Sequence, residues 1–90
     1  MNQSVWIFNG ASSKFPGGVF SSLEVAEKWI LANSLSGVLT EYPIDIGVID
    51  WALNNGYFTP KSPAQLTPNF ISGFTSASQA HFHFEAGERA

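Results

Sequence analysis

The sequence predicts an α+β fold, with a mostly antiparallel sheet of about four strands and one long helix and one or two short helices packed on it. Short runs rich in β-branched and aromatic residues recur along the chain, separated by Gly, Pro and Asn. One longer segment has the periodicity of an amphipathic helix. The chain has 90 residues, so residues 1–90 are expected to form a single domain, with residues 86–90 as a frayed tail.

The first strand is expected in SVWIF, residues 4–8. Valine and isoleucine alternate with tryptophan and phenylalanine, so both faces are apolar, which is typical of an interior strand covered on each side. Two turn sequences follow, Asn-Gly at 9–10 and Pro-Gly at 16–17. Either turn can lead into a second strand at 19–20.

The long helix is expected in SSLEVAEKWILANS. Ser21 is the expected N-cap, and Glu24 completes a capping box. Phe20 is expected to pack on Val25 as a hydrophobic staple. Most apolar side chains fall on one face, but Leu31 projects onto the charged side. There it either tucks under a loop or contacts a partner.

In the second half of the chain, the sequence predicts shorter strands and helices. A strand is expected at 37–42, and a short helix at 47–55 ends before a glycine suited to a left-handed cap. Three prolines make the segment 59–69 an expected extended surface loop. Thr-Pro at 67–68 is typical of a cap and first position of a helical turn. A last strand is expected at 80–85.

Composition excludes several classes of partner. Four Lys and Arg against seven Asp and Glu give a net charge of −3. The basic residues are scattered singly, so nucleic acid is not an expected partner, because phosphate binding needs clustered cations. The chain has no cysteine, which excludes disulfides and thiolate metal ligands. No signal peptide or membrane-spanning run is evident, so we expect a cytoplasmic protein without membrane contact.

Both histidines lie in the stretch QAHFHFE. On a strand, His81, His83 and Glu85 share one face, while Phe82 and Phe84 share the other. Two imidazoles and a carboxylate match zinc and non-haem iron ligands, but a closed site needs ligands from a second element. We therefore favour phenylalanines in the core and histidines at the surface, with no metal and no cofactor. A metal or small-ligand site, or a pH-sensitive partner contact, remains the alternative.

The sequence contains no recognisable catalytic constellation. Its serines lie near turns and caps, where local hydrogen bonding explains them. Neither a G-x-S-x-G elbow nor a phosphate-binding glycine loop is present. We expect a protein that is not an enzyme and has no catalytic residues.

Three segments, FPGGVFSSLEVAEKWI, LSGVLTEYPIDIGVIDWALNNGYFTPK and FTSASQAHFHFE, resemble a family of small bacterial proteins that is classed only as a domain of unknown function. The resemblance extends from Val5 to Glu85 and implies a bacterial cytoplasmic protein without an assigned catalytic residue. In size, acidity and α+β architecture, the chain is also loosely similar to immunity proteins that neutralise bacterial toxins.

The leading functional prediction is a non-catalytic module that binds another protein, most concretely an immunity-type protein that occludes a toxin. Exposed aromatic residues would anchor the partner, and carboxylates at the rim would speed association. A self-associating structural module, as a homodimer through leftover apolar surface or a sheet edge, is a further alternative. The candidate partner-binding residues are Leu31, Glu41, Asp45, Asp50, Trp51, Tyr57 and Phe58.

Overall fold

The structure is a computed structural model that describes residues 4–90. Its strands form one antiparallel sheet of five strands in the order β2-β1-β3-β4-β5. The α+β class and the antiparallel sheet are confirmed, with five strands rather than about four. The elements in chain order are β1 (Ser4–Gly10), β2 (Pro16–Phe20), α1 (Leu23–Ala32), β3 (Gly37–Pro43), α2 (Val48–Asn54), the 3-10 helix η1 (Pro63–Leu66), α3 (Pro68–Ser72), β4 (His81–Glu85) and β5 (Glu88–Arg89).

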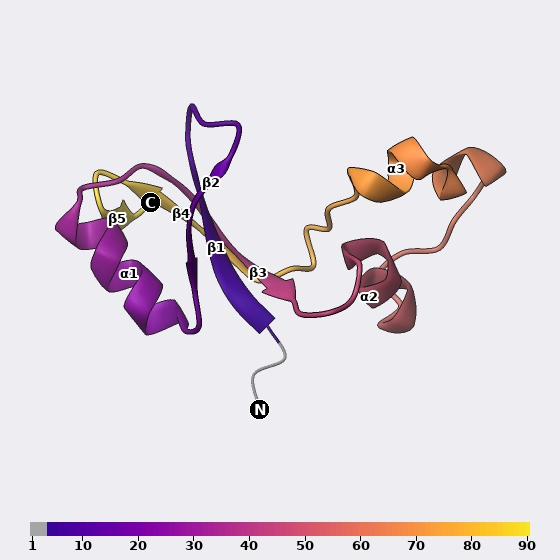
Figure 1. The fold of residues 1–90 in the computed structure, drawn as a ribbon, viewed down its shortest axis with the longest axis horizontal. Helices are drawn as coiled ribbons and strands as arrows, with labels where there is room; N and C mark the ends of the chain where they lie inside the picture. The colour runs from indigo at the N-terminus through magenta and orange to yellow at the C-terminus, as the bar shows by residue number, and fades with distance from the viewer. Residues whose placement is uncertain (1–3) are drawn as a thin grey trace.

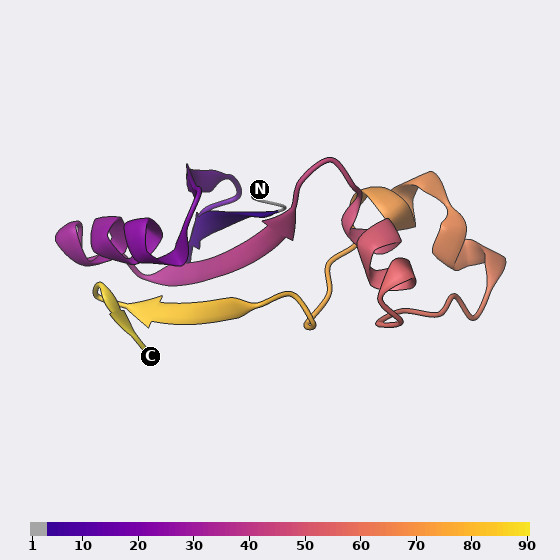
Figure 2. The ribbon, with the colours of Figure 1, turned by 90° about the horizontal axis from the view of Figure 1, so that it is seen from below.

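The molecule is elongated, with two parts end to end (Figure 1). The sheet with α1 forms one part, and residues 44–80, here called the helical extension, carry the shorter helices beyond the end of the sheet (Figure 2). The radius of gyration is 14.4 Å, against about 12 Å for a compact chain of this length. Of the short helices, which were expected to pack on the sheet, α2 contacts β3 near its end, and the others lie farther from the sheet (Figure 1).

The main core lies between α1 and one face of the sheet. Phe8 and Leu39 are register partners on β1 and β3, and both are buried beneath α1. Ala26 and Ile30 of α1 and Phe84 of β4 complete the buried cluster. Each large side chain in such a cluster contributes roughly 1.5–3 kcal/mol through burial. As predicted, the phenylalanines of β4 point to this side and the histidines to the other.

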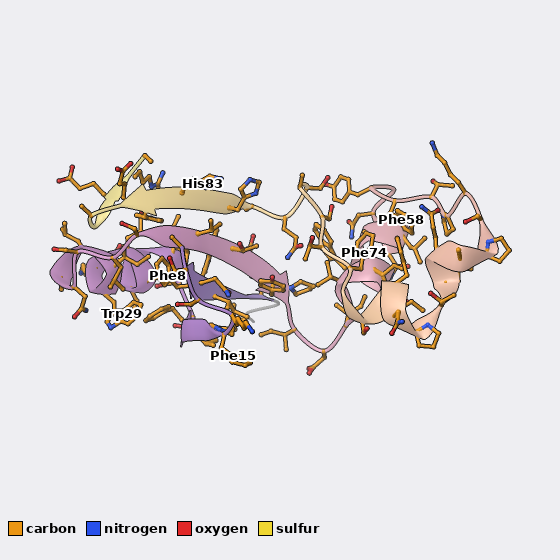
Figure 3. The ribbon with its side chains drawn as sticks, turned by 90° about the horizontal axis from the view of Figure 1, so that it is seen from above. Phe8, Phe15, Trp29, Phe58, Phe74 and His83 are labelled. Carbon is orange, nitrogen blue, oxygen red and sulfur yellow. The ribbon has the colours of Figure 1, made fainter. Side chains whose placement is uncertain are left out.

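Aromatic rings extend this core along the same face. Trp29 of α1 meets Phe8 edge-on with ring centroids 5.9 Å apart, and it contacts Phe20 at 5.2 Å. Trp6 stacks on Phe82 at 6.0 Å. Phe8 and Trp29 are labelled in Figure 3, in the half of the molecule that contains the sheet and α1. Large rings thus supply much of the buried area that a short chain needs.

The opposite face of the sheet is covered less well than expected. It carries Val5, Ile7 and Val38, which are only partly buried, and Val19, which is 62% exposed. Within residues 4–90, α1 packs on the face that carries Phe8 and not on this one. The prediction that both faces of the first strand are covered is wrong, because an apolar pattern does not determine how many layers the chain supplies.

The β1–β2 turn and the start of α1 differ from the predictions by a few residues. The turn follows Gly10, whose carbonyl accepts a hydrogen bond from the Ser13 N–H at 3.0 Å, while Pro-Gly at 16–17 already belongs to β2. Ser22, not Ser21, caps α1 by accepting from the Val25 N–H at 3.2 Å. Both serines are good caps, so the sequence did not distinguish them.

The shifted cap also changes the expected staple and capping box. With Ser22 as the cap, Glu24 occupies the second helical position, so it cannot complete the box. Val25 is 51% exposed, and Phe20 packs on Trp29 instead. Leu31 lies on the charged side, as expected, but it is 59% exposed, so it does not tuck under a loop.

Local sequence signals correctly located α2 and α3 of the extension. Gly56 follows α2 with a φ of 74°, the left-handed conformation expected of it. Thr67 caps α3 by accepting from the Phe70 N–H at 3.4 Å. The expected extended loop at 59–69 is partly wrong, because it contains η1. No helix within residues 4–90 combines the length and apolar character required to cross a membrane.

The extension has a small interior of its own. Phe58, Phe70 and Phe74 contact one another with ring centroids 4.8–5.9 Å apart, and Phe58 and Phe74 lie together in Figure 3. Ile49 and Ala52 of α2 are buried. This interior is separate from the cluster beneath α1.

The C-terminal residues 86–90, which were expected to be a frayed tail, form a hairpin with β4 in the structure. Ala86 and Gly87 both have positive φ, as in a type I′ hairpin turn, and β5 pairs with β4. The Gly87 N–H donates to the Leu35 carbonyl at 2.8 Å. Arg89 forms a 2.5 Å hydrogen bond with Glu27, which raises the pKa of Arg89 above its usual value, and it lies over the Phe82 ring.

The adjacent residues Ile30 and Leu31 provide a matched test of this core. Ile30 is fully buried, whereas Leu31 is 59% exposed. Ile30→Ala should lower the free energy of unfolding by about 2–5 kcal/mol, because it leaves a cavity. Leu31→Ala should cost less than about 1 kcal/mol. Urea denaturation measures both, and equal losses would contradict the position of the core.

Alanine substitutions at two glycines with positive φ distinguish the cost of backbone strain from the cost of steric crowding. A Cβ at Gly87 would lie 3.2 Å from the Cα atoms of Leu31 and Ser34, whereas one at Gly56 would meet nothing within 4 Å. Gly56→Ala should cost about 1 kcal/mol through strain alone. Gly87→Ala should cost roughly 1–3 kcal/mol more. Equal costs in denaturation experiments would show that the C-terminal hairpin does not pack on α1.

Candidate functional site

A cleft of about 490 Å³ lies where the sheet meets the helical extension. Its floor comes from the ends of β1 and β3, and its walls come from α2 and the chain segments on either side of the extension. A cleft of this volume falls in the usual range for binding sites. The lining residues are Ser4, Glu41, Pro43, Ile44, Ile46, Trp51, Ser78, Gln79 and Ala80.

Strand alternation explains the floor of the cleft. Ser4 lies four residues before Phe8 on β1, and Glu41 lies two residues after Leu39 on β3, so both are on the face that α1 covers farther along. The side chains on this face change from large and apolar to polar at that point. The cleft is therefore the part of the core-bearing face that lies beyond the main cluster.

Among residues 4–90, Glu41 is the only one with an ionisable side chain in the cleft lining. Its Oε2 accepts a hydrogen bond from the Ser4 hydroxyl at 2.5 Å, which fixes one carboxylate oxygen. Oε1 has no hydrogen-bond partner among the described residues. One oriented acceptor is thus available to a ligand group.

Gln79 holds the chain that leaves the extension against β3. It is only 3% exposed. Its side-chain Nε2 donates to the Glu41 carbonyl at 3.1 Å, and its Oε1 accepts from the Ser76 N–H at 3.0 Å. The Ala80 carbonyl accepts from the Glu41 N–H at 2.9 Å. The buried amide is therefore paired at both ends, as burial requires.

The opposite wall is apolar. Trp51 of α2 lines the cleft and contacts Tyr57, with ring centroids 5.3 Å apart. The Asn55 side chain donates to the Trp51 carbonyl at 2.8 Å, which closes the end of the helix. Ile44 and Ile46 lie on the link between β3 and α2, and both are exposed. A partner group in the cleft would thus contact one carboxylate and a largely apolar wall.

The structure brings some of the predicted contact residues together. Glu41 and Trp51 line the same cleft. Asp45 lies on the link between the two isoleucines and is exposed, and Asp50 is exposed in the first turn of α2. Tyr57 is 54% exposed and contacts the Trp51 ring at a tilted angle of 47°. Asp45, Asp50 and Tyr57 thus do not line the cleft themselves but adjoin residues that do.

Two other predicted contact residues lie elsewhere. Leu31 is at the end of α1, in the sheet half of the molecule, where it borders Gly87 and the C-terminal hairpin. Phe58 belongs to the aromatic interior of the extension. Neither lines the cleft.

The two histidines lie on the open face of β4. Their ring centroids are 5.8 Å apart, and both side chains are exposed, as is Glu85. The His81 Nδ1 lies 2.7 Å from the Gln79 carbonyl, which can only accept, so this nitrogen donates. Within residues 4–90, no group of three or more potential ligands is arranged to hold a metal ion.

Sequence reasoning missed Ser4 and Gln79. The even spacing of Ser4 from Phe8 was a usable signal, since it places the serine on the core-bearing face. Gln79 offered no such signal, because it lies in a polar segment, TSASQ, that resembles an ordinary loop.

Gln79→Ala should lower the free energy of unfolding by about 1–3 kcal/mol, because the Glu41 carbonyl and the Ser76 N–H would lose their buried side-chain partner. The neighbouring Ser78→Ala is the control. Its side chain is exposed, so we expect a change within about 0.5 kcal/mol. If urea denaturation gives the two variants the same stability, Gln79 does not anchor this junction.

Comparison with known proteins identifies the family. No curated protein and no solved structure matches the chain. A family model matches residues 5–90, which is nearly the whole chain. The expected bacterial origin and likeness to toxin-immunity proteins do not follow from this match. The chain belongs to the family described as domain of unknown function (DUF7710).

Proposed function

We propose that the protein is a non-catalytic module that binds another protein through the cleft and the adjoining surface of the helical extension. The observation that carries this proposal is the number of large apolar side chains that the extension leaves exposed. Surface of this kind is typical of protein-binding sites, where a partner covers it. These side chains are Ile44, Ile46, Leu53, Tyr57, Leu66 and Ile71.

The chemistry of the cleft favours binding over catalysis. Acid–base catalysis generally needs two positioned groups, and the described part of the lining holds a single carboxylate, Glu41. The serines of the lining would need a general base to act as nucleophiles. The side chains of His81 and His83 are on the other face of the sheet, away from Ser4. Binding requires none of these groups.

The most concrete version of this function is toxin neutralisation by occlusion. The surface that we assign to the partner carries Glu41, Asp45 and Asp50 beside exposed aromatic and aliphatic groups. Such a surface suits a basic active-site face, because opposite charge speeds association and apolar anchors slow release. The protein would then act by covering the partner's active site.

Affinity capture from the native host tests the contact surface. Tyr57→Ser and Val19→Ser each replace an exposed apolar side chain, at 54% and 62% exposure. Tyr57 adjoins the cleft, whereas Val19 is on β2 at the far edge of the sheet. We expect a captured protein that is lost with Tyr57→Ser and retained with Val19→Ser. If capture is instead lost with Val19→Ser and retained with Tyr57→Ser, the proposal is contradicted.

The immunity version has its own test. A neighbouring gene should encode a toxin, and co-expression of this chain should suppress its lethality. Tyr57→Ser should weaken the protection, and Val19→Ser should preserve it. If co-expression does not suppress the toxin's lethality, toxin neutralisation is contradicted. The broader proposal of protein binding would then be decided by the capture experiment.

A further inference from the structure

We propose that the cleft receives an arginine side chain of the partner protein, with the guanidinium group on Glu41 and the aliphatic stem along the apolar wall. This inference rests on the proposed function and deepens it, because it specifies what the partner must place in the cleft. It follows from the charge, the hydrogen bonding and the lining of the cleft.

The charge of the cleft region is negative. Glu41 is in the floor, and Asp45 and Asp50 are exposed on the adjoining link and helix. None of the Lys and Arg side chains, which all lie within the described residues 4–90, lines the cleft. These residues are Lys14 after β1, Lys28 on α1, Lys61 before η1 and Arg89 on β5.

The carboxylate is oriented by a neutral donor. The Ser4 hydroxyl holds Oε2 without supplying a positive charge, so the carboxylate keeps its full attraction for a cation. Oε1 accepts no hydrogen bond within residues 4–90 and can receive a charge-assisted N–H donor.

The walls favour a guanidinium over an ammonium group. Arginine has a planar, weakly hydrated head group that stacks on aromatic rings, and Trp51 supplies such a ring in the lining. Pro43, Ile44 and Ile46 supply apolar surface for the methylene stem. A lysine ammonium would gain the charge contact but would lose more hydration.

The surroundings favour a protein as the source of this arginine. The cleft opens beside exposed apolar side chains, including Tyr57, that a small molecule within it would leave uncovered. A protein partner buries these side chains together with the arginine. The arginine would then be the central contact and the apolar rim would exclude water from it.

The test compares two probes that differ mainly in charge, N-acetyl-arginine amide and N-acetyl-citrulline amide, by NMR titration of the full chain. The arginine probe should bind in the millimolar range, about three- to fivefold more tightly than citrulline. The signals that shift should include the Trp51 indole N–H and the Ala80 amide.

Two carboxylate variants make the test specific. Glu41→Gln keeps an acceptor for the Ser4 hydroxyl and removes the charge, so it should abolish the preference for arginine. Glu85→Gln changes the net charge equally, at an exposed site on β4, and should leave the preference intact. Equal binding of both probes, or a preference that survives Glu41→Gln, would overturn the inference.

Other outcomes separate this inference from the proposed function. Capture of a partner that depends on Tyr57 but not on Glu41 would overturn the arginine contact and leave the binding function in place. Micromolar binding of the isolated arginine probe would indicate a small-molecule site, and it would overturn a partner side chain as the occupant.

Discussion

The packing of Ile30 against Phe8 and Leu39 is the interaction on which the rest of the structure depends. One ten-residue helix covers one part of one sheet face. Within residues 4–90 no second layer covers the opposite face, whose apolar side chains are only partly buried. The far end of the core-bearing face is left to form the floor of the cleft, with Ser4 and Glu41 as its polar side chains.

The helical extension depends on local contacts and on its two connections to the sheet. Three phenylalanines and two buried residues of α2 form its interior, which is small for 37 residues (44–80). At the exit of the extension, the Gln79 amide binds both β3 and its own loop. A small interior leaves apolar side chains exposed. The limited burial that keeps the stability of the extension low therefore also provides the surface that we assign to a partner.

Elements governed by local chemistry were predictable from the sequence. The inward phenylalanines of β4 follow from alternation, and the start of α3 follows from Thr67 and Pro68. Elements that depend on distant contacts were not predictable. The last strand is held by Leu35 and Glu27 through bonds to Gly87 and Arg89. In the cleft, Glu41 bonds to Ser4 and to Gln79, which are 37 and 38 positions away in the sequence. Glu41 and Trp51 could therefore be selected as candidates but not placed together.

Amide hydrogen exchange of the full chain, with and without its bound partner, tests most directly whether the cleft is the recognition site. Binding in the cleft should slow amide exchange at residues 41–46, 51–57 and 78–80, which line or adjoin it. Exchange at Val38 and His83, on the open face of the sheet, should be unchanged. Protection confined to that open face, with the cleft amides unaffected, would contradict the account.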